Sequence, residues 1–281
     1  MQFYKIKSYA KLNLALNVIR KKSFLHEIES IIVFIDLHDE IFIRESKSLV
    51  HKILFTGKFS KKIGKKNTIS KLLKILDDKK LLNDRKFIVK IDKKIPHKSG
   101  LGGGSMNAAS ILKYFVKKKI IKTNKKEINL ICNLIGSDVI LGLNSTNSVM
   151  DAKNQITRYT NYKKFYTLIV KPNFGCATKE IYSKVKKFNK PKFNKPLRKM
   201  FNYNYLKNTE NSLEQIAFTK YKKLKKIKLF LEGLSSPIFV RMTGSGSALV
   251  AYFHSKERCN DAKKQFIRKY KNYWCIASKT I

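Results

Sequence analysis

The sequence has few acidic residues, few cysteines and few prolines, and it has no long apolar run. Its 281 residues include 19 Asp and Glu against 61 Lys and Arg, 4 cysteines, 5 prolines and one tryptophan. The cysteines are far apart and form no Cys-x-x-Cys pair, which argues against a zinc knuckle or a disulfide framework. No stretch approaches the roughly 18 apolar residues of a membrane span, and the first residues lack a signal-peptide pattern. We therefore expect a soluble protein of the reducing cytoplasm.

The excess of lysine gives the chain a formal net charge of +42. Such a charge favours nucleic-acid binding, because Lys and Arg neutralise phosphates and release counterions. However, only 8 of the 61 basic residues are arginines, the residue that grips phosphate and guanine with two hydrogen bonds. The lysines are spread along the whole sequence, and a drift toward codons poor in G and C explains them as well. We expect no specific nucleic-acid partner and no membrane partner, although anionic small molecules should be attracted.

Hydrophobic periodicity predicts a mixture of strands and helices around a real core. Apolar residues at every second position from Leu12 to Val18 predict a strand over 3–19, with Lys11, Asn13 and Asn17 on its other face. Further strands are expected at 28–43, 87–91, 167–170 and 248–253, and helices at 67–76, 108–116, 126–135 (capped by Gly136), 209–232 and 256–270. Residues 186–207 are expected to be irregular. Because strands and helices do not alternate strictly, we predict an α+β fold with two lobes, residues 1–155 and 156–281.

The strongest motif is a glycine-rich segment between a predicted strand and a predicted helix. Four glycines in five positions let the backbone approach a ligand closely, and a helix start directs free N–H groups toward an anion. We therefore predict a phosphate-binding loop composed of Pro96, His97, Lys98, Ser99, Gly100, Leu101, Gly102, Gly103, Gly104, Ser105 and Met106. The pattern is neither a Walker A loop nor a dinucleotide motif. A flexible hinge is the alternative, but the helix start Ser105–Ala109 argues against it.

Three segments in order resemble the motifs of the GHMP small-molecule kinases, such as homoserine and mevalonate kinases. The glycine loop is similar to their phosphate-binding motif, Ser8–Leu14 to their N-terminal motif and Met242–Ala248 to their C-terminal glycine motif. The strings Phe34–Asp39 and Ile135–Val139 are most similar to the branch that phosphorylates a cytidine diphosphate-linked methylerythritol on the non-mevalonate route to isoprenoids. The resemblance implies an N-terminal lobe like domain 2 of ribosomal protein S5, a ferredoxin-like C-terminal lobe, and ATP with Mg²⁺ as cofactors.

The resemblance further implies that Lys11 and Asp138 are the catalytic pair. Transfer of the ATP γ-phosphate to an alcohol needs a group that orients the hydroxyl and a positive charge that stabilises the transferring oxygens. Taken alone, Asp138 also fits a helix N-cap just after Gly136, and Lys11 is one lysine among 53. By the same resemblance Ser105 is a candidate Mg²⁺ ligand, although the metal can also sit mainly on the ATP.

The remaining predicted contacts concern the two nucleotides and also come from the resemblance. It implies that His26 bonds the pyrimidine edge, that Tyr182 stacks on the cytosine, and that Asn67 lies near the adenine. Phe24 takes the place of a family tyrosine in the altered stretch Ser23–His26, whereas Met150–Asn154 departs too far from the family for contacts to be carried over. The other substrate contacts are Asn13, Thr178, Thr243, Gly244, Ser245 and Gly246, of which the last four should close over the diphosphate or the reacting hydroxyl.

Two alternatives remain open at this point. A superfamily kinase that acts on another alcohol, for example homoserine or a mevalonate derivative, needs no cytidine site, so binding of CDP distinguishes it. A basic nucleic-acid-binding protein would bind RNA or DNA with a steep salt dependence and show no kinase activity. The shortage of arginine and the lack of a basic aromatic array argue against this second alternative. The sequence does not decide between a monomer and a homodimer.

Overall fold

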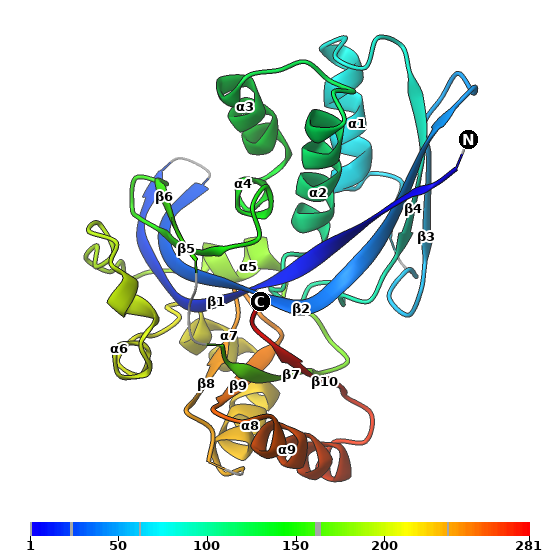
Figure 1. The fold of residues 1–281 in the computed structure, drawn as a ribbon. Helices are drawn as coiled ribbons and strands as arrows, with labels where there is room; N and C mark the ends of the chain where they lie inside the picture. Colours follow the sequence, from blue (N-terminus) through cyan, green and yellow to red (C-terminus); the bar gives the residue numbers. More distant parts are fainter. Residues whose placement is uncertain (1, 23–24, 62, 161–163, 235) are drawn as a thin grey trace. The chain divides into compact units, whose positions relative to one another are not determined.

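The computed structural model describes residues 2–22, 25–61, 63–160, 164–234 and 236–281, which form two compact units (Figure 1). The first unit comprises the described residues of 1–10, 37–97 and 102–145, and the second those of 11–36, 98–101 and 146–281. Two long strands, β1 (Tyr4–Lys22) and β2 (Leu25–Ser46), contribute to both units. The lobe boundary expected between residues 155 and 156 stays a prediction.

The first unit packs helices against paired strands. The second half of β2 pairs antiparallel with β4 (Lys86–Asp92), which pairs parallel with β3 (Lys52–Thr56). The helices are α1 (Thr68–Asp78), α2 (Gly103–Lys117), α3 (Lys125–Ile135) and the short α4 (Val139–Gly142). The apolar face of α1 is fully buried, as its spacing of three and four residues predicts, and it packs into one core with α2, α3 and β4. Each such leucine or isoleucine contributes about 1.5–3 kcal/mol by burial.

The second unit contains an antiparallel sheet in the order β10-β7-β9-β8, with α8 and α9 packed on it (Figure 1). In chain order this sheet is β7 (Tyr166–Lys171), β8 (Phe239–Met242), β9 (Leu249–Phe253) and β10 (Trp274–Lys279), and the helices that pack on it are α8 (Lys222–Glu232) and α9 (Lys256–Lys269). This order and connectivity are those of the ferredoxin-like βαββαβ arrangement, as expected. The unit also has β5 (Asn147–Met150) and β6 (Ile156–Tyr159) beside the first half of β2, together with α5 (Thr178–Ser183), the 3₁₀ turn Arg198–Phe201, α6 (Tyr203–Lys207) and α7 (Glu214–Lys220).

The long strands, β4, β7, β9 and the helices α1, α3 and α9 confirm the sequence-based predictions, including the cap of α3 at Gly136. The single helix predicted over 209–232 is wrong: Tyr221 leaves the helical region (φ −118°, ψ 74°) between α7 and α8, and 209–213 form a turn. The segment 186–207 is not wholly irregular, since it contains a 3₁₀ turn and α6. Helix α2 starts at Gly103, inside the glycine motif, where the Met106 N–H already bonds the Gly102 carbonyl at 2.9 Å.

Among the residues that the structure describes, no helix combines the length and the apolarity needed to cross a membrane.

Candidate functional site

The polar face of β1 is buried and held by hydrogen bonds. Lys11 and Asn13, two residues apart and so on one face of the strand, are each only 3% exposed. Lys11 Nζ donates to Asn13 Oδ1 at 2.7 Å, and Asn13 Nδ2 donates to Ser30 Oγ at 2.8 Å. The Ser30 hydroxyl donates in turn to the Ala15 carbonyl at 2.6 Å. This series of hydrogen bonds fixes the rotamer of Asn13, and Asn13 holds the Lys11 ammonium at a defined place on the strand.

Two glycine segments that are far apart in the sequence interlock in the second unit. The Ser247 N–H donates to the Lys98 carbonyl at 3.2 Å, and the Ala248 N–H donates to the Ser99 carbonyl at 3.1 Å. Gly100 and Gly244 both have positive φ, 77° and 54°. A Cβ on Gly100 would lie 1.9 Å from the carbonyl oxygen of Thr243, so only glycine permits this approach. The predicted C-terminal glycine motif and residues 98–101 therefore form one structural element.

Thr243 joins this element to β1. Its hydroxyl accepts a hydrogen bond from the Asn13 N–H at 3.0 Å and donates to the Gly100 carbonyl at 3.3 Å. The Lys11 N–H donates to the Leu101 carbonyl at 3.1 Å. The second unit thus brings together residues from all three sequence motifs.

A turn before α5 extends this element. Thr178 Oγ1 and Ser245 Oγ lie 2.9 Å apart, and the Ser247 hydroxyl donates to the Phe174 carbonyl at 2.8 Å. Both predicted hydroxyl residues, Thr178 and Ser245, therefore lie side by side. Hydroxyl groups can donate to phosphate oxygens, so this pair fits the expected contact with a diphosphate.

The residues predicted for the cytidine side form an aromatic group. The His26 ring centroid lies 5.2 Å from that of Tyr182 and 6.5 Å from that of Phe188. Burial lowers the pKa of His26 below its ordinary value, and the positive charge of Lys21 lowers it further. The neutral imidazole has one donor and one acceptor nitrogen, which suits a pyrimidine edge. Phe24 lies outside the residues that the structure describes.

Phe188 is a further candidate that the sequence did not predict. Its ring neighbours His26, and 45% of its surface is exposed. It stands in the lysine- and asparagine-rich segment 186–207, where no periodicity marks any residue. Only its aromatic character in a polar run could have singled it out.

The rest of the glycine motif belongs to the first unit, where it begins α2. Gly102 occupies the N-cap with φ 71°, and as a glycine it has no side chain to cap the helix. The first N–H groups of a helix have no acceptor within the helix, so Gly103, Gly104 and Ser105 present donors suited to phosphate. Thr68, at the start of α1, donates its hydroxyl to the Gly104 carbonyl at 2.8 Å and fixes this turn.

The fully buried carboxylate of Asp39 anchors the segment before the loop and was not given a role by sequence reasoning. It forms an ion pair with Lys93 and accepts from the N–H groups of Lys94 at 2.8 Å and Ile95 at 2.9 Å. Its other oxygen also accepts from Asn107 Nδ2 on α2 at 3.0 Å. An acidic residue inside an apolar strand, in a chain with so few acids, was the available signal.

Three further predicted residues in the first unit make contacts of their own. Asp138 occupies the N-cap position of α4, as the N-cap alternative predicts, but its side chain makes no capping hydrogen bond there. Asn67 caps α1: its Oδ1 accepts from the N–H groups of Ile69 and Ser70 at 3.0 and 3.1 Å. A ring nitrogen of His97 bonds the Phe59 carbonyl. The predicted ATP contacts of Asn67 and His97 stay predictions. The same holds for the predicted ATP contacts of Pro96 and Met106, which are both buried.

The turn before α7 supports the C-terminal glycine motif and was missed because a helix was predicted there. The buried Asn211 donates through Nδ2 to the carbonyls of Met242 and Gly244, both at 2.8 Å. Glu214 accepts the Met242 N–H at 3.0 Å and forms an ion pair with Lys228 at 3.0 Å. The backbone entering the glycine motif is therefore held at its N–H and at its carbonyl. An Asn at the start of an expected helix was the signal for a cap or turn.

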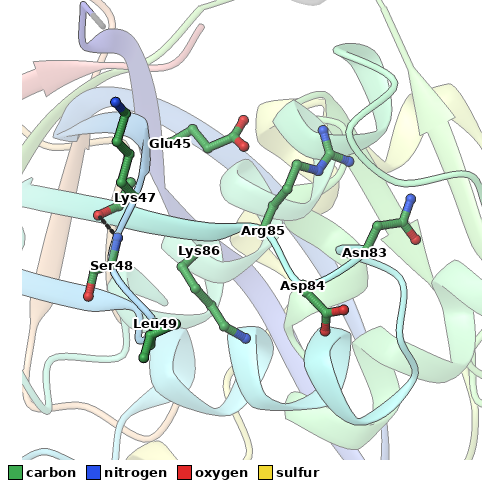
Figure 2. A pocket seen from close by; sticks show the side chains of 9 residues that line it. Glu45, Lys47, Ser48, Leu49, Asn83, Asp84, Arg85 and Lys86 are labelled. Carbon is green, nitrogen blue, oxygen red and sulfur yellow. Dashed lines mark hydrogen bonds between the residues drawn. The ribbon is translucent and has the colours of Figure 1, made fainter.

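Neither a cluster of metal-ligating side chains nor the best-formed surface hollow coincides with the predicted site residues in the described part of the chain. No group of three His, Cys, Asp or Glu side chains suited to a metal occurs in the described part of the chain. A surface hollow of about 520 Å³ lies between the loop after β2 and the turn before β4 (Figure 2), lined by Glu45–Leu49 and Asn83–Lys86. It carries both signs of charge and contains no predicted site residue.

Comparisons with known proteins agree with these motifs. Residues 67–153 match the model of the GHMP kinases N-terminal domain. The chain is 58% identical, over the whole length of both chains, to a 4-diphosphocytidyl-2-C-methyl-D-erythritol kinase of Pelagibacter ubique (strain HTCC1062).

Two solved structures share the fold. A 4-(cytidine 5'-diphospho)-2C-methyl-D-erythritol kinase superposes with a TM-score of 0.78 at 20% identity, covering 99% of this chain and all of that one. A homoserine kinase from Cytophaga hutchinsonii superposes with a TM-score of 0.68 at 14% identity, covering all of this chain and 95% of that one. At these identities the likeness shows the fold alone.

Proposed function

The chain belongs to the 4-diphosphocytidyl-2-C-methyl-D-erythritol kinase family, and we propose that it transfers the γ-phosphate of ATP to the 2-hydroxyl of that cytidyl substrate. The observation that carries the proposal is the 58% identity over the whole chain. The uncapped start of α2 at Gly103 and the buried Lys11–Asn13 pair support it, because a helix start offers backbone donors and the pair offers a fixed cation for phosphate oxygens. The product would feed the non-mevalonate route to isopentenyl diphosphate, and we place the reaction in the cytoplasm.

We assign the chemistry to Lys11 and Asp138. Phosphoryl transfer requires little covalent work from a protein; it needs an aligned hydroxyl and compensation of charge on the transferring oxygens. Asp138 orients the substrate hydroxyl and accepts its proton. Lys11, whose position is set by Asn13, stabilises the developing negative charge.

Mg²⁺ fits this assignment as an ion that arrives with ATP. Magnesium usually binds through substrate phosphates and one or two protein groups, so a protein cage of carboxylates is not required. Ser105, at the first turn of α2, is the residue that we assign to it. When bound, the ion neutralises charge on the phosphates.

The cytidine side distinguishes this function from that of a superfamily kinase with another alcohol. A neutral His26 beside Tyr182 and the exposed Phe188 supports a site for a pyrimidine ring. Calorimetry with CDP tests this point directly. No binding of CDP, together with turnover of homoserine or a mevalonate derivative, would replace the proposal by that alternative.

The kinase assay uses purified protein with ATP, Mg²⁺ and the cytidyl substrate, and compares it with Asp138→Asn. The amide keeps the size of the side chain but cannot accept the hydroxyl proton, so kcat should fall by about 100-fold or more. Thermal unfolding of the variant checks that any loss of turnover does not come from a loss of folding. Undiminished turnover by the variant would refute the role of Asp138.

A further inference from the structure

Lys98 has a left-handed backbone conformation, with φ 47°. Glycine adopts this region readily, whereas a residue with a Cβ is strained there. A strained residue persists only where its surroundings hold it, and such residues gather at functional sites. The positive φ of Lys98 therefore needs an explanation, whereas that of the nearby Gly100 and Gly102 does not, because they are glycines.

Two contacts hold Lys98 in this conformation. Its carbonyl accepts the Ser247 N–H at 3.2 Å, which fixes its backbone to the C-terminal glycine motif. Its side-chain stem packs on Gly175, where an added Cβ would lie 2.5 Å from Lys98 Cβ and 3.3 Å from Lys98 Cδ. The backbone of Gly175 thus forms a floor for the lysine stem, and the direction of the stem is set.

The turn that supports Lys98 is itself built by another lysine. Lys171 Nζ donates to the carbonyls of Pro172 and Phe174, both at 2.9 Å, so its ammonium is used within the turn. The ammonium of Lys98 differs, because it makes no ion pair or hydrogen bond with any residue in the described part of the chain, and Lys98 is exposed. One lysine shapes the turn, and the other extends over it with its charge available.

The surroundings of Lys98 suit an anion with several oxygens. The same turn continues to Thr178, whose hydroxyl lies 2.9 Å from that of Ser245. The Lys98 stem packs on the turn that leads to this hydroxyl pair, and its ammonium has no carboxylate partner among the described residues, a combination that matches phosphate oxygens.

We propose that Lys98 binds phosphate oxygens of a diphosphate group in one of the two substrates, an inference that rests on the proposed function. The diphosphate belongs either to ATP or to the cytidyl substrate, and both present the same chemistry to an ammonium group. The left-handed backbone of Lys98 is then explained by the binding contact that its side chain makes.

The test compares Lys98→Gly with Lys119→Gly. Lys119 is also an exposed lysine with positive φ (53°), in the turn after α2, and it is outside the predicted site. Each substitution relieves left-handed strain, so each should leave the melting temperature equal or raise it by about 1–3 °C. Only Lys98→Gly should also raise a KM, by about tenfold, as expected for the loss of one charge-assisted hydrogen bond. The substrate whose KM changes identifies the diphosphate.

Lys98→Met keeps the stem on Gly175 and removes only the charge, so it should raise the same KM without the gain in stability. Values of KM within twofold of the wild type for both substrates, in both Lys98 variants, would overturn the proposal.

Calorimetric titration with inorganic pyrophosphate needs no turnover and separates the two levels of inference. Weaker pyrophosphate binding by Lys98→Gly supports the proposed contact even for a preparation without kinase activity, in which case only the proposed function fails. Equal affinity of the wild type, Lys98→Gly and Lys119→Gly for pyrophosphate refutes the role of Lys98.

Discussion

His26 lies beside Tyr182 and Phe188, and its protonation is set by its immediate surroundings. Burial disfavours the charged imidazolium, and the nearby positive charge of Lys21 disfavours it further. Both effects lower the pKa below its ordinary value, so the ring is neutral at pH 7. The unfolded chain takes up this proton first as the pH falls, and His26 therefore lowers the stability only below about pH 6.5.

We predict that NMR titration of the His26 ring protons gives a midpoint below the ordinary value for histidine. Lys21→Ala should raise this midpoint, because it removes a repulsive charge. Lys22→Ala removes an exposed neighbour that does not act on His26, so it should leave the midpoint unchanged. CDP affinity should fall at the same midpoint if the neutral ring binds the pyrimidine. A midpoint that Lys21→Ala leaves in place would contradict the assigned cause.

Single residues were predictable where a periodic pattern or a motif marked them. The polar face of β1 was visible in the sequence because Lys11, Asn13 and Asn17 alternate with apolar residues. The hydrogen-bond partners of Asp39 and Asn211 were not visible, since they are backbone groups that only the fold brings near these side chains. Composition and spacing carry no record of which carbonyl a buried amide will meet.

At the scale of elements, long and strongly periodic segments were predicted well. The short strands β3, β5, β6, β8 and β10 were missed, since strands of 4 to 6 residues depend on pairing partners more than on their own pattern. The helix predicted over 209–232 joined two apolar faces that the structure separates at Tyr221. The turn at Asn211 also lies within the range predicted as helix.

The turn around Asn211 should control the C-terminal glycine motif. Asn211→Ala removes both hydrogen bonds to the carbonyls of Met242 and Gly244 and leaves these buried acceptors unpaired, at a cost of about 1–3 kcal/mol each. We expect a lower melting temperature together with a higher KM for the cytidyl substrate and a smaller change for ATP. Steady-state kinetics and thermal unfolding measure the two effects.

Asn208→Ala is the matched control for this prediction, because Asn208 is an exposed asparagine whose Nδ2 donates to the Asn204 carbonyl at 3.1 Å. It should change neither KM nor the melting temperature by much. A loss of stability in Asn211→Ala with unchanged KM values would mean that the turn supports the fold but not the site.

At the scale of the whole molecule, the order of the motifs predicted the protein family, whereas composition alone did not. The charge of +42 suggests a polyanion partner, whereas three motifs in sequence indicated a small-molecule kinase, and the full-length identity of 58% supports the latter. Net charge informs solubility, steering and non-specific binding, but it does not specify a fold. The charge must nevertheless affect the stability of a chain with 61 basic and only 19 acidic residues.

We predict that salt stabilises this protein. Most positive charges have no acidic partner, so repulsion among lysines should dominate over attraction in the described ion pairs, many of which are exposed and weak. The Debye length falls from roughly 20–30 Å in about 0.01–0.02 M salt to less than 8 Å above about 0.15 M, which screens this repulsion. The melting temperature should therefore rise by a few degrees between these conditions.

The KM for ATP should rise over the same range of salt, because screening weakens the attraction of an anionic substrate.

Thermal unfolding in NaCl, with sucrose at equal osmolality as the control, measures the effect of salt on stability. A melting temperature that falls with salt would mean that ion pairs outweigh the repulsion.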